Sequence, residues 1–402
     1  MTKTHSYLHI TGGIGAALLP FAFPWLSPVY GLIIMALGTL AAGRKNFRFA
    51  PLLLFTVFID WQWLSTTWSE HSIEGWGDVI MVLPITVMGI LMHTIALDEH
   101  QNWVKRWMET FAWATLAAWT FIFCKSLYLN GWVSYKEFEL GGRLGVHFQS
   151  LYLIAAALIL ERKIWRKTYG LSLLRAGAVL WLLFGVIVLS VRIHLIIVPI
   201  IATIRFWELS YKNKKNWKKI LGVGSLALAL GALLITTLPG PRERLIDLRN
   251  EIRSIDGKVD GKQTNHRIFI WGEGIKIITE HPVVGLGNGA GEFELNERLG
   301  ELEVYFYRGK EAYTLDEFMY DFHNIWIQSW VESGLVAVLL LAAIFLWGLF
   351  KSKGVLRYIW LLLILTGTTE SLLDKQAGAL LIAFIVGLTA LQSLKKRREP
   401  LS

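Results

Sequence analysis

A histidine–asparagine pair, His323–Asn324, stands where a long polar stretch gives way to a strongly apolar segment, and Gly334 follows it. Imidazole is the side chain best suited to take a proton from a hydroxyl group near neutral pH. An isolated histidine at such a boundary is more often an ordinary interface residue, so its surroundings decide the prediction. A catalytic role for His323 would place the chemistry at the boundary between membrane and water, on the outward-facing side.

Arginines near other segment ends are candidates for binding an anion. Arg192 stands at the outer end of two apolar segments, with His194 two residues later. Ionisable residues at membrane depth usually line a polar cavity; the alternative is that Arg192 extends to the interface. Arg267 opens a predicted helix beside His266, and an arginine at a helix N-terminus suits a phosphate; the alternative is a solvated surface arginine. Arg143 is a further candidate.

Composition sets the elements that must position these residues. Hydrophobic residues make up 54% of the 402 positions, and apolar runs recur at the length that a hydrocarbon core roughly 30 Å thick requires of a helix. We therefore predict an all-α polytopic membrane protein with about twelve transmembrane helices. The predicted spans are 8–25, 27–43, 49–68, 77–97, 108–128, 144–161, 171–189, 192–209, 220–238, 323–349, 355–373 and 376–394.

Basic residues predict the orientation of these spans. Lysines and arginines follow every even-numbered span, ending with Lys395 to Arg398, so both termini are expected in the cytoplasm. Topology thus accounts for most of the net charge of +9, with no nucleic-acid partner. The predicted domains are a bundle at 1–238, an outer loop at 239–322, and spans ten to twelve with a basic tail at 323–402. The single cysteine, Cys124, excludes an intrachain disulfide.

The outer loop is predicted to contain two amphipathic helices. The first runs from Arg242 to Ile255, with Arg242 and Arg249 beside its apolar stripe. The second should begin near Asn265 and end before Pro282. Its predicted apolar stripe consists of Ile268, Trp271, Ile275 and Ile278. Such helices would pack as a lid over the outward mouth of the bundle; the alternative is that they lie on the membrane surface.

These motifs occur in a fixed order that resembles the O-antigen ligase family. The set is Asn265-His266-Arg267, Trp271, Glu280-His281-Pro282, Gly285-x-Gly287-x-Gly289-x-x-x-Phe293, His323-Asn324 and Gly334. The superfamily includes O-antigen ligases, O-antigen polymerases and protein O-oligosaccharyltransferases. The resemblance covers the outer loop and span ten in sequence, and the rest of the chain in topology. It implies a bundle of the glycosyltransferase-C kind, working on the periplasmic side of a Gram-negative inner membrane.

The resemblance also implies roles for particular residues. His323 would be the essential histidine, and Arg192 and Arg267 would contact a lipid-linked diphosphate. The other predicted substrate-binding residues are Asn324, Arg143, His194, His266, Arg242 and Arg249. Related sequences often place a glycine after the arginine that matches Arg192, whereas Ile193 follows here, which leaves the role of His194 open. Glu370 and Asp374, at the outer end of span eleven, are weaker candidates for the site.

The implied reaction moves a polysaccharide from undecaprenyl diphosphate to a sugar hydroxyl of lipid A–core oligosaccharide. Negative charge grows on the departing diphosphate, so cations are needed where it appears. No Asp-x-Asp pair occurs in the chain, and we predict transfer that inverts the anomeric centre without a metal or cofactor. His323 would act as the base, or would orient the acceptor hydroxyl.

Three alternatives remain open. An O-antigen polymerase would use the same donor with a second carrier-linked glycan as acceptor; the place of the loop just before the histidine favours the ligase. A protein O-oligosaccharyltransferase would typically have a longer C-terminal part. A flippase or other transporter of lipid-linked sugars would spread charged residues through several spans and contain an internal repeat, and neither pattern is evident.

Overall fold

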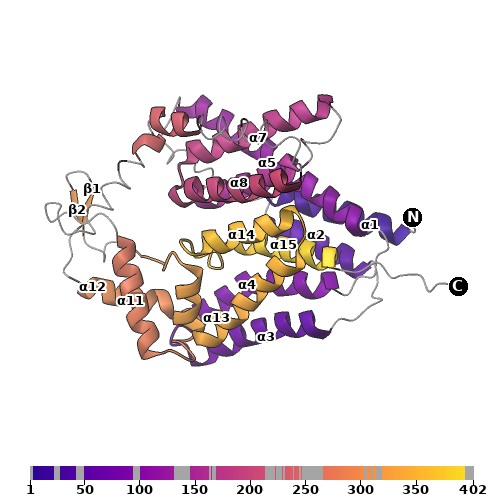
Figure 1. The fold of residues 1–402 in the computed structure, drawn as a ribbon. Helices are drawn as coiled ribbons and strands as arrows, with labels where there is room; N and C mark the ends of the chain where they lie inside the picture. Colours follow the sequence, from indigo (N-terminus) through magenta and orange to yellow (C-terminus); the bar gives the residue numbers. More distant parts are fainter. Residues whose placement is uncertain are drawn as a thin grey trace. The chain divides into compact units, whose positions relative to one another are not determined.

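The protein is described by a computed structural model, and its described part is helical apart from one short hairpin (Figure 1). The structure describes residues 3–21, 28–41, 49–93, 100–130, 145–162, 164, 169–212, 222, 229, 231–238, 240–243, 246, 266–302, 306–308, 311–313 and 319–393. Five described helices are long and apolar enough to cross a membrane, which is consistent with a helical membrane protein. The full count of twelve spans and the periplasmic position of the loop stay predictions.

In the predicted span 220–238 the structure describes residues 222, 229 and 231–238, which are helical except at 238. Described helices overlap every other predicted span. Their bounds are α1 Lys3–Leu18, α2 Pro28–Ala41, α3 Phe49–Ser65, α4 Ser72–His93, α5 His100–Asn130, α6 Val146–Glu161, α7 Tyr169–Leu189, α8 Arg192–Lys212, α13 Ile325–Lys351, α14 Val355–Gly367 and α15 Gln376–Ser393. Two boundaries matter for the site. The α13 span begins at Ile325, so His323 precedes it, and α14 ends three residues before Glu370.

The chain forms two compact units. Unit 1 comprises Met1–Thr11, Leu32–Val104 and Leu248–Ser402, and unit 2 comprises Gly12–Gly31 and Lys105–Asp247. In unit 2, α6 packs along α7, and both contact α8. The predicted domains followed membrane topology, which this division does not test, so they stay predictions. His323 and Arg267 both belong to unit 1.

Helix α15 is the central helix of unit 1. It is buried continuously from Ala377 to Leu391, and it packs against α4, α13 and α14, while α3 packs against α4 and α13 (Figure 1). Small residues permit this close approach: a Cβ added at Gly387 would come within 2.9 Å of the Met88 side chain. Burial on all sides explains why the sequence of α15 is apolar all round.

Helix α13 is kinked at Gly334, and the glycine-rich turn after α11 fits against the kink. Gly334 has a φ of +71°, and a Cβ there would lie 2.0 Å from the Val283 carbonyl oxygen. The kink leaves backbone carbonyls for other donors. Two hydrogen bonds of 2.8 Å join the turn to α13, from Leu286 N to Val331 O and from Gly287 N to Glu332 O. Gly285 and Gly334 therefore serve this contact between turn and helix, whereas Gly287 and Gly289 allow the turn to approach Ser69 and Gly75 near the start of α4.

The outer segment of unit 1 contains α11 (His266–Glu280), α12 (Gly291–Glu301) and a hairpin of β1 (Phe306–Arg308) with β2 (Glu311–Tyr313). The hairpin is antiparallel, with Phe306 opposite Tyr313. It corrects the expectation of an entirely helical loop. Of the two predicted helices, the second is confirmed, because α11 ends before Pro282. Most of the first lies outside the described residues, and the lid stays a prediction.

The predicted apolar stripe of α11 was wrong at two of its four positions: Trp271 and Ile278 pack against a small core, but Ile268 and Ile275 do not. Ile268 is 47% exposed and Ile275 55% exposed, whereas Ile270 and Ile277 are fully buried. These two lie two turns apart, on either side of Gly274, where an added Cβ would lie 2.7 Å from the Ile327 side chain. A search for apolar side chains gives a glycine no weight, so it missed the face through which α11 contacts α13. The small core there consists of Ile270, Ile277, Leu295, Leu299, Phe322 and Val331.

Candidate active site

The start of α13 fixes the position of His323. Asn324 is the N-cap residue, and its Oδ1 accepts hydrogen bonds from Trp326 N at 3.0 Å and Ile327 N at 3.2 Å. Its Nδ2 donates to Thr368 O at 3.0 Å. Asparagine is a favoured N-cap because its side chain satisfies backbone N–H groups that have no partner within the helix. Asn324 thus anchors the residue after the histidine to both α13 and the end of α14.

The residues before His323 are anchored as firmly. Phe322 is fully buried, and its carbonyl accepts a hydrogen bond from Trp271 Nε1 at 2.9 Å. The side chain of Asn296 pairs with the backbone of Tyr320, as acceptor at 2.8 Å and donor at 2.9 Å. Helices α11 and α12 therefore hold the segment that presents the histidine.

The imidazole of His323 lies beside two carboxylates. Asp321 Oδ1 is 2.9 Å from His323 Nδ1 and Glu370 Oε2 is 3.8 Å from it. The same Asp321 oxygen accepts a hydrogen bond from the His323 backbone N–H at 2.8 Å. The His323 side chain is 30% exposed. Because Nδ1 faces these carboxylates, Nε2 is the nitrogen through which a substrate hydroxyl would interact.

Two further cations complete a row of alternating charges. Arg267 Nη2, at the start of α11, is 3.0 Å from Glu370 Oε1. Lys375 Nζ, just before α15, is 3.2 Å from Asp321 Oδ2. The order along the row is Arg267, Glu370, His323, Asp321 and Lys375, so each carboxylate bridges two cationic side chains when the imidazole is protonated.

The charges shift the pKa of both members of the central pair. Burial lowers the pKa of His323, but the hydrogen bonds and charges of Asp321 and Glu370 outweigh it and raise the pKa to about 9. Burial likewise raises the pKa of Asp321, but the contacts with His323 and the charge of Lys375 lower it to about 2. At neutral pH the pair is therefore an imidazolium and a carboxylate.

Further carboxyl side chains, half-buried at Glu292 and Asp374, interact electrostatically with Asp321 and Lys375. Burial raises the pKa of Glu292 and of Asp374, and the charges of Asp78 and Glu332 interact with theirs. Glu332 accepts a hydrogen bond from Gln328 at 2.7 Å and is not a direct partner of His323, as its helical spacing predicted. Within the described part of the chain, no His, Cys, Asp or Glu side chains are grouped so as to hold a metal ion.

The structure brings only some of the predicted site residues together. Arg267 and Asn324 lie with His323, and Glu370, the weaker candidate, contacts both His323 and Arg267. The side chain of His266, and the whole of Arg143 and Arg249, lie outside the described residues.

The remaining candidates belong to unit 2, so their proximity to His323 stays a prediction. Arg192 begins α8 and is half-buried, while His194 is fully buried. Arg242 is exposed.

Sequence reasoning assigned no role to Asp321 or Lys375. Asp321 had a detectable signal, because a carboxylate two residues before a histidine can reach its backbone N–H. Lys375 had none, because it reaches the site only through the packing of α15.

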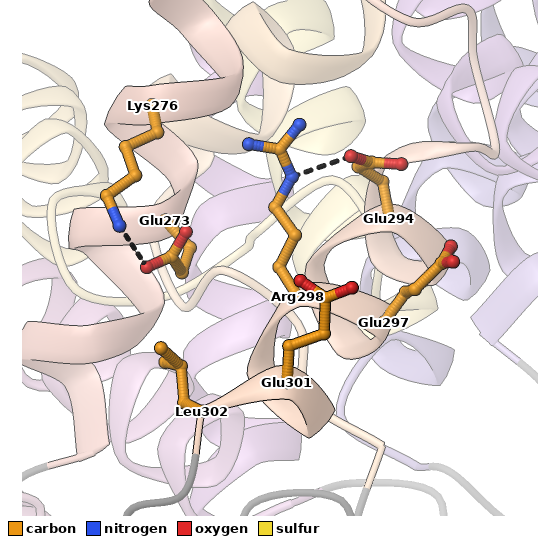
Figure 2. Close-up of a pocket in the computed structure, with 7 residues that line it drawn as sticks. All are labelled: Glu273, Lys276, Glu294, Glu297, Arg298, Glu301 and Leu302. Carbon is orange, nitrogen blue, oxygen red and sulfur yellow. Dashed lines mark hydrogen bonds and ion pairs between the residues drawn. The ribbon is translucent and has the colours of Figure 1, made fainter.

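A separate groove lies between α11 and α12 and does not include His323 (Figure 2). Its volume is about 410 Å³, and it is lined by Glu273, Lys276, Glu294, Glu297, Arg298, Glu301 and Leu302. Arg298 bonds to Glu294 at 2.6 Å and to Glu280 at 2.9 Å, which ties α12 to the end of α11. We place the chemistry at His323, because the perturbed titratable groups gather there.

Comparison with known families agrees with this location. Residues 177–342 match the family model described as O-antigen ligase, and Arg192, Arg267 and His323 all lie within the matched range. No curated protein matched the chain. The part of the chain that carries the candidate active site is therefore similar to the O-antigen ligase family.

Proposed function

We propose that the protein is an O-antigen ligase of the bacterial inner membrane. It transfers a polysaccharide from undecaprenyl diphosphate to a sugar hydroxyl of lipid A–core oligosaccharide, with both termini in the cytoplasm and the site facing the periplasm. The observation that carries the proposal is a partly exposed imidazole, held at Nδ1 by Asp321, beside the Arg267–Glu370 pair, in a segment that matches the O-antigen ligase family.

The proposed chemistry is a direct displacement at the anomeric carbon. The acceptor O–H bond breaks as its proton passes to His323 Nε2, and the acceptor oxygen bonds to the anomeric carbon. The bond from that carbon to the phosphate oxygen breaks, and its electron pair leaves with the diphosphate. Attack from the side opposite the leaving group inverts the anomeric centre.

Arg267 is the cation of unit 1 that we assign to the diphosphate, with Arg192 as the second. A guanidinium binds phosphate oxygens through paired N–H groups, and it acts best where the charge develops. Arg267 is engaged with Glu370 at 3.0 Å while its side chain remains 30% exposed. The donor would therefore share or displace Glu370 when it binds.

The proposed base must lose a proton before it can act. With a pKa of about 9, roughly one molecule in a hundred has a neutral His323 imidazole at pH 7. Activity that depends on this neutral form must increase with pH. An orienting imidazolium would give the opposite dependence, which makes the pH profile decisive between the two roles.

The test is reconstitution of the purified protein in liposomes with a carrier-linked glycan and lipid A–core, followed by gel shift of the product. A ligase yields capped lipid A–core, and His323→Ala abolishes it. His281→Ala is the matched control, because His281 is exposed at the end of α11 and should leave transfer intact. Longer glycan on the carrier with an uncapped core would identify a polymerase instead, and movement of donor without transfer would identify a transporter.

A further inference from the structure

We infer that Asp321 is a positioning residue for His323. We also infer that Lys375, which pairs with the other oxygen of the same carboxylate, weakens the attraction between Asp321 and the imidazolium. This inference rests on the proposed function, because it concerns how the imidazole is presented to the acceptor hydroxyl. Neither residue was assigned a role on the basis of sequence.

The first support is the double contact of one carboxylate oxygen. Asp321 Oδ1 accepts from the His323 backbone N–H at 2.8 Å and lies 2.9 Å from Nδ1 of the same residue. One atom thereby fixes the backbone and the ring of the histidine together. It also selects the form with hydrogen on Nδ1, which leaves Nε2 for the acceptor.

The second support is the backbone conformation of His323. Its φ is +46°, in the left-handed region that residues with a Cβ rarely adopt. Such a conformation persists only where the surroundings impose it, and it concentrates at functional sites. Phe322 is held by Trp271 and Asn324 by the start of α13, so the hydrogen bond that His323 N–H donates to Asp321 acts on the strained residue between two anchored neighbours.

The third support is the position of Lys375. Its Nζ lies 3.2 Å from Asp321 Oδ2, the oxygen that does not contact His323. An ammonium there stabilises the charged carboxylate and weakens the electrostatic attraction between that carboxylate and the imidazolium. The two residues should therefore have opposite effects on the proton affinity of His323.

Among the described residues, three carboxylates act on His323: Asp321, Glu370 and Glu292. Other charged groups act on those carboxylates, and they are Arg267, Lys375, Asp374, Asp78 and Glu332. Of these described side chains, Asp321 alone contacts both the ring and the backbone of the histidine, which separates it from Glu370, whose nearest oxygen is 3.8 Å from the ring.

The experiment measures kcat between pH 6 and 10, at saturating donor and acceptor, in the reconstituted full-length protein. Asp321→Asn keeps an oxygen for the backbone N–H but removes the charge. In the plot of kcat against pH, we expect the rising limb of this variant to move to lower pH by about one unit. The plateau of kcat should fall roughly 10²-fold or more, because the ring loses its fixed orientation. Lys375→Gln should move the limb to higher pH.

Matched controls are Glu301→Gln and Lys276→Gln, two changes of the same type in the groove of Figure 2, which should leave the wild-type profile unchanged. A wild-type profile for Asp321→Asn, or a lowered plateau with an unmoved limb, overturns the inference. If Asp321→Asn does not fold, Lys375→Gln alone decides, since an unmoved or lowered limb contradicts the tuning. Failure of the proposed function is distinguishable, because His323→Ala would then transfer glycan normally.

Discussion

The sharpest prediction concerns the pH dependence of the wild-type protein. Asp321, Glu370 and Glu292 surround the imidazole of His323, and Arg267 and Lys375 pair with the first two. Burial lowers the pKa of His323, but Asp321 and Glu370 outweigh it and raise the pKa from the usual 6.5 to about 9. At 1.36 kcal/mol per unit, this amounts to about 3 kcal/mol in favour of the imidazolium.

The direction of the effect follows from the role of His323 as base. Below a pKa of about 9, the neutral fraction grows about tenfold for each unit of pH, so kcat should rise about tenfold per unit from pH 6 to pH 8. It should level off at or above pH 9, because kcat reports the pKa of the donor-bound protein, and bound donor releases Glu370 toward His323. The assay is initial-rate gel shift at saturating substrates, with His281→Ala measured in parallel as a control for the folded state across the range.

Two results would refute this reasoning. A kcat that falls through pH 9 would mean that the protonated imidazole is the active form, and His323 would then orient the acceptor without removing its proton. A flat profile would mean that the step limiting kcat does not involve His323 titration, and single-turnover rates at the same pH values would then show whether transfer itself is flat.

Three further predictions follow from the geometry. Arg267→Gln should raise the KM for the donor and lower kcat at least roughly tenfold, measured in the same assay, whereas a change in acceptor KM alone would contradict a diphosphate contact. Gly334→Ala should lower the free energy of unfolding by about 2 kcal/mol or more, because the φ of Gly334 is +71° and the new Cβ would meet the Val283 carbonyl. Thermal unfolding in detergent measures this. Gly272→Ala is the control, because Gly272 has open space around it, and it should not destabilise the protein. Dialysis against a chelator should leave transfer unchanged, and loss of activity that magnesium or manganese restores would disprove the metal-free mechanism.

Hydropathy was sufficient to predict most of the helices. A membrane span must form its backbone hydrogen bonds within the segment, so long apolar runs form helices. The bounds were less certain, because caps and turns decide them. The predicted span 323–349 began two residues early, since Asn324 is the N-cap and α13 begins at Ile325.

Contacts across the fold were not predictable in the same way. The pairing of His323 with Asp321 is local, because the two residues are only two positions apart in the sequence. Glu370 and Lys375 reach the site from the segment between α14 and α15. The position of Glu370 at the end of a span made it a weak candidate, but the sequence around Lys375 gave no indication of this contact. The buried face of α11 was missed for a related reason, because Gly274 makes the contact by having no side chain.

The shared carboxylates suggest why the proposed site contains acids as well as arginines. A leaving diphosphate needs cations, yet cations gathered without a counter-charge would repel one another while the donor is absent. In the structure, Glu370 bridges Arg267 and His323, and Asp321 bridges His323 and Lys375. If the donor takes the place of Glu370 at Arg267, that carboxylate can turn fully toward His323 and favour its protonated form. Proton uptake by the histidine and departure of the diphosphate would then be coupled through one glutamate, so Glu370→Gln should weaken the dependence of the His323 pKa on bound donor.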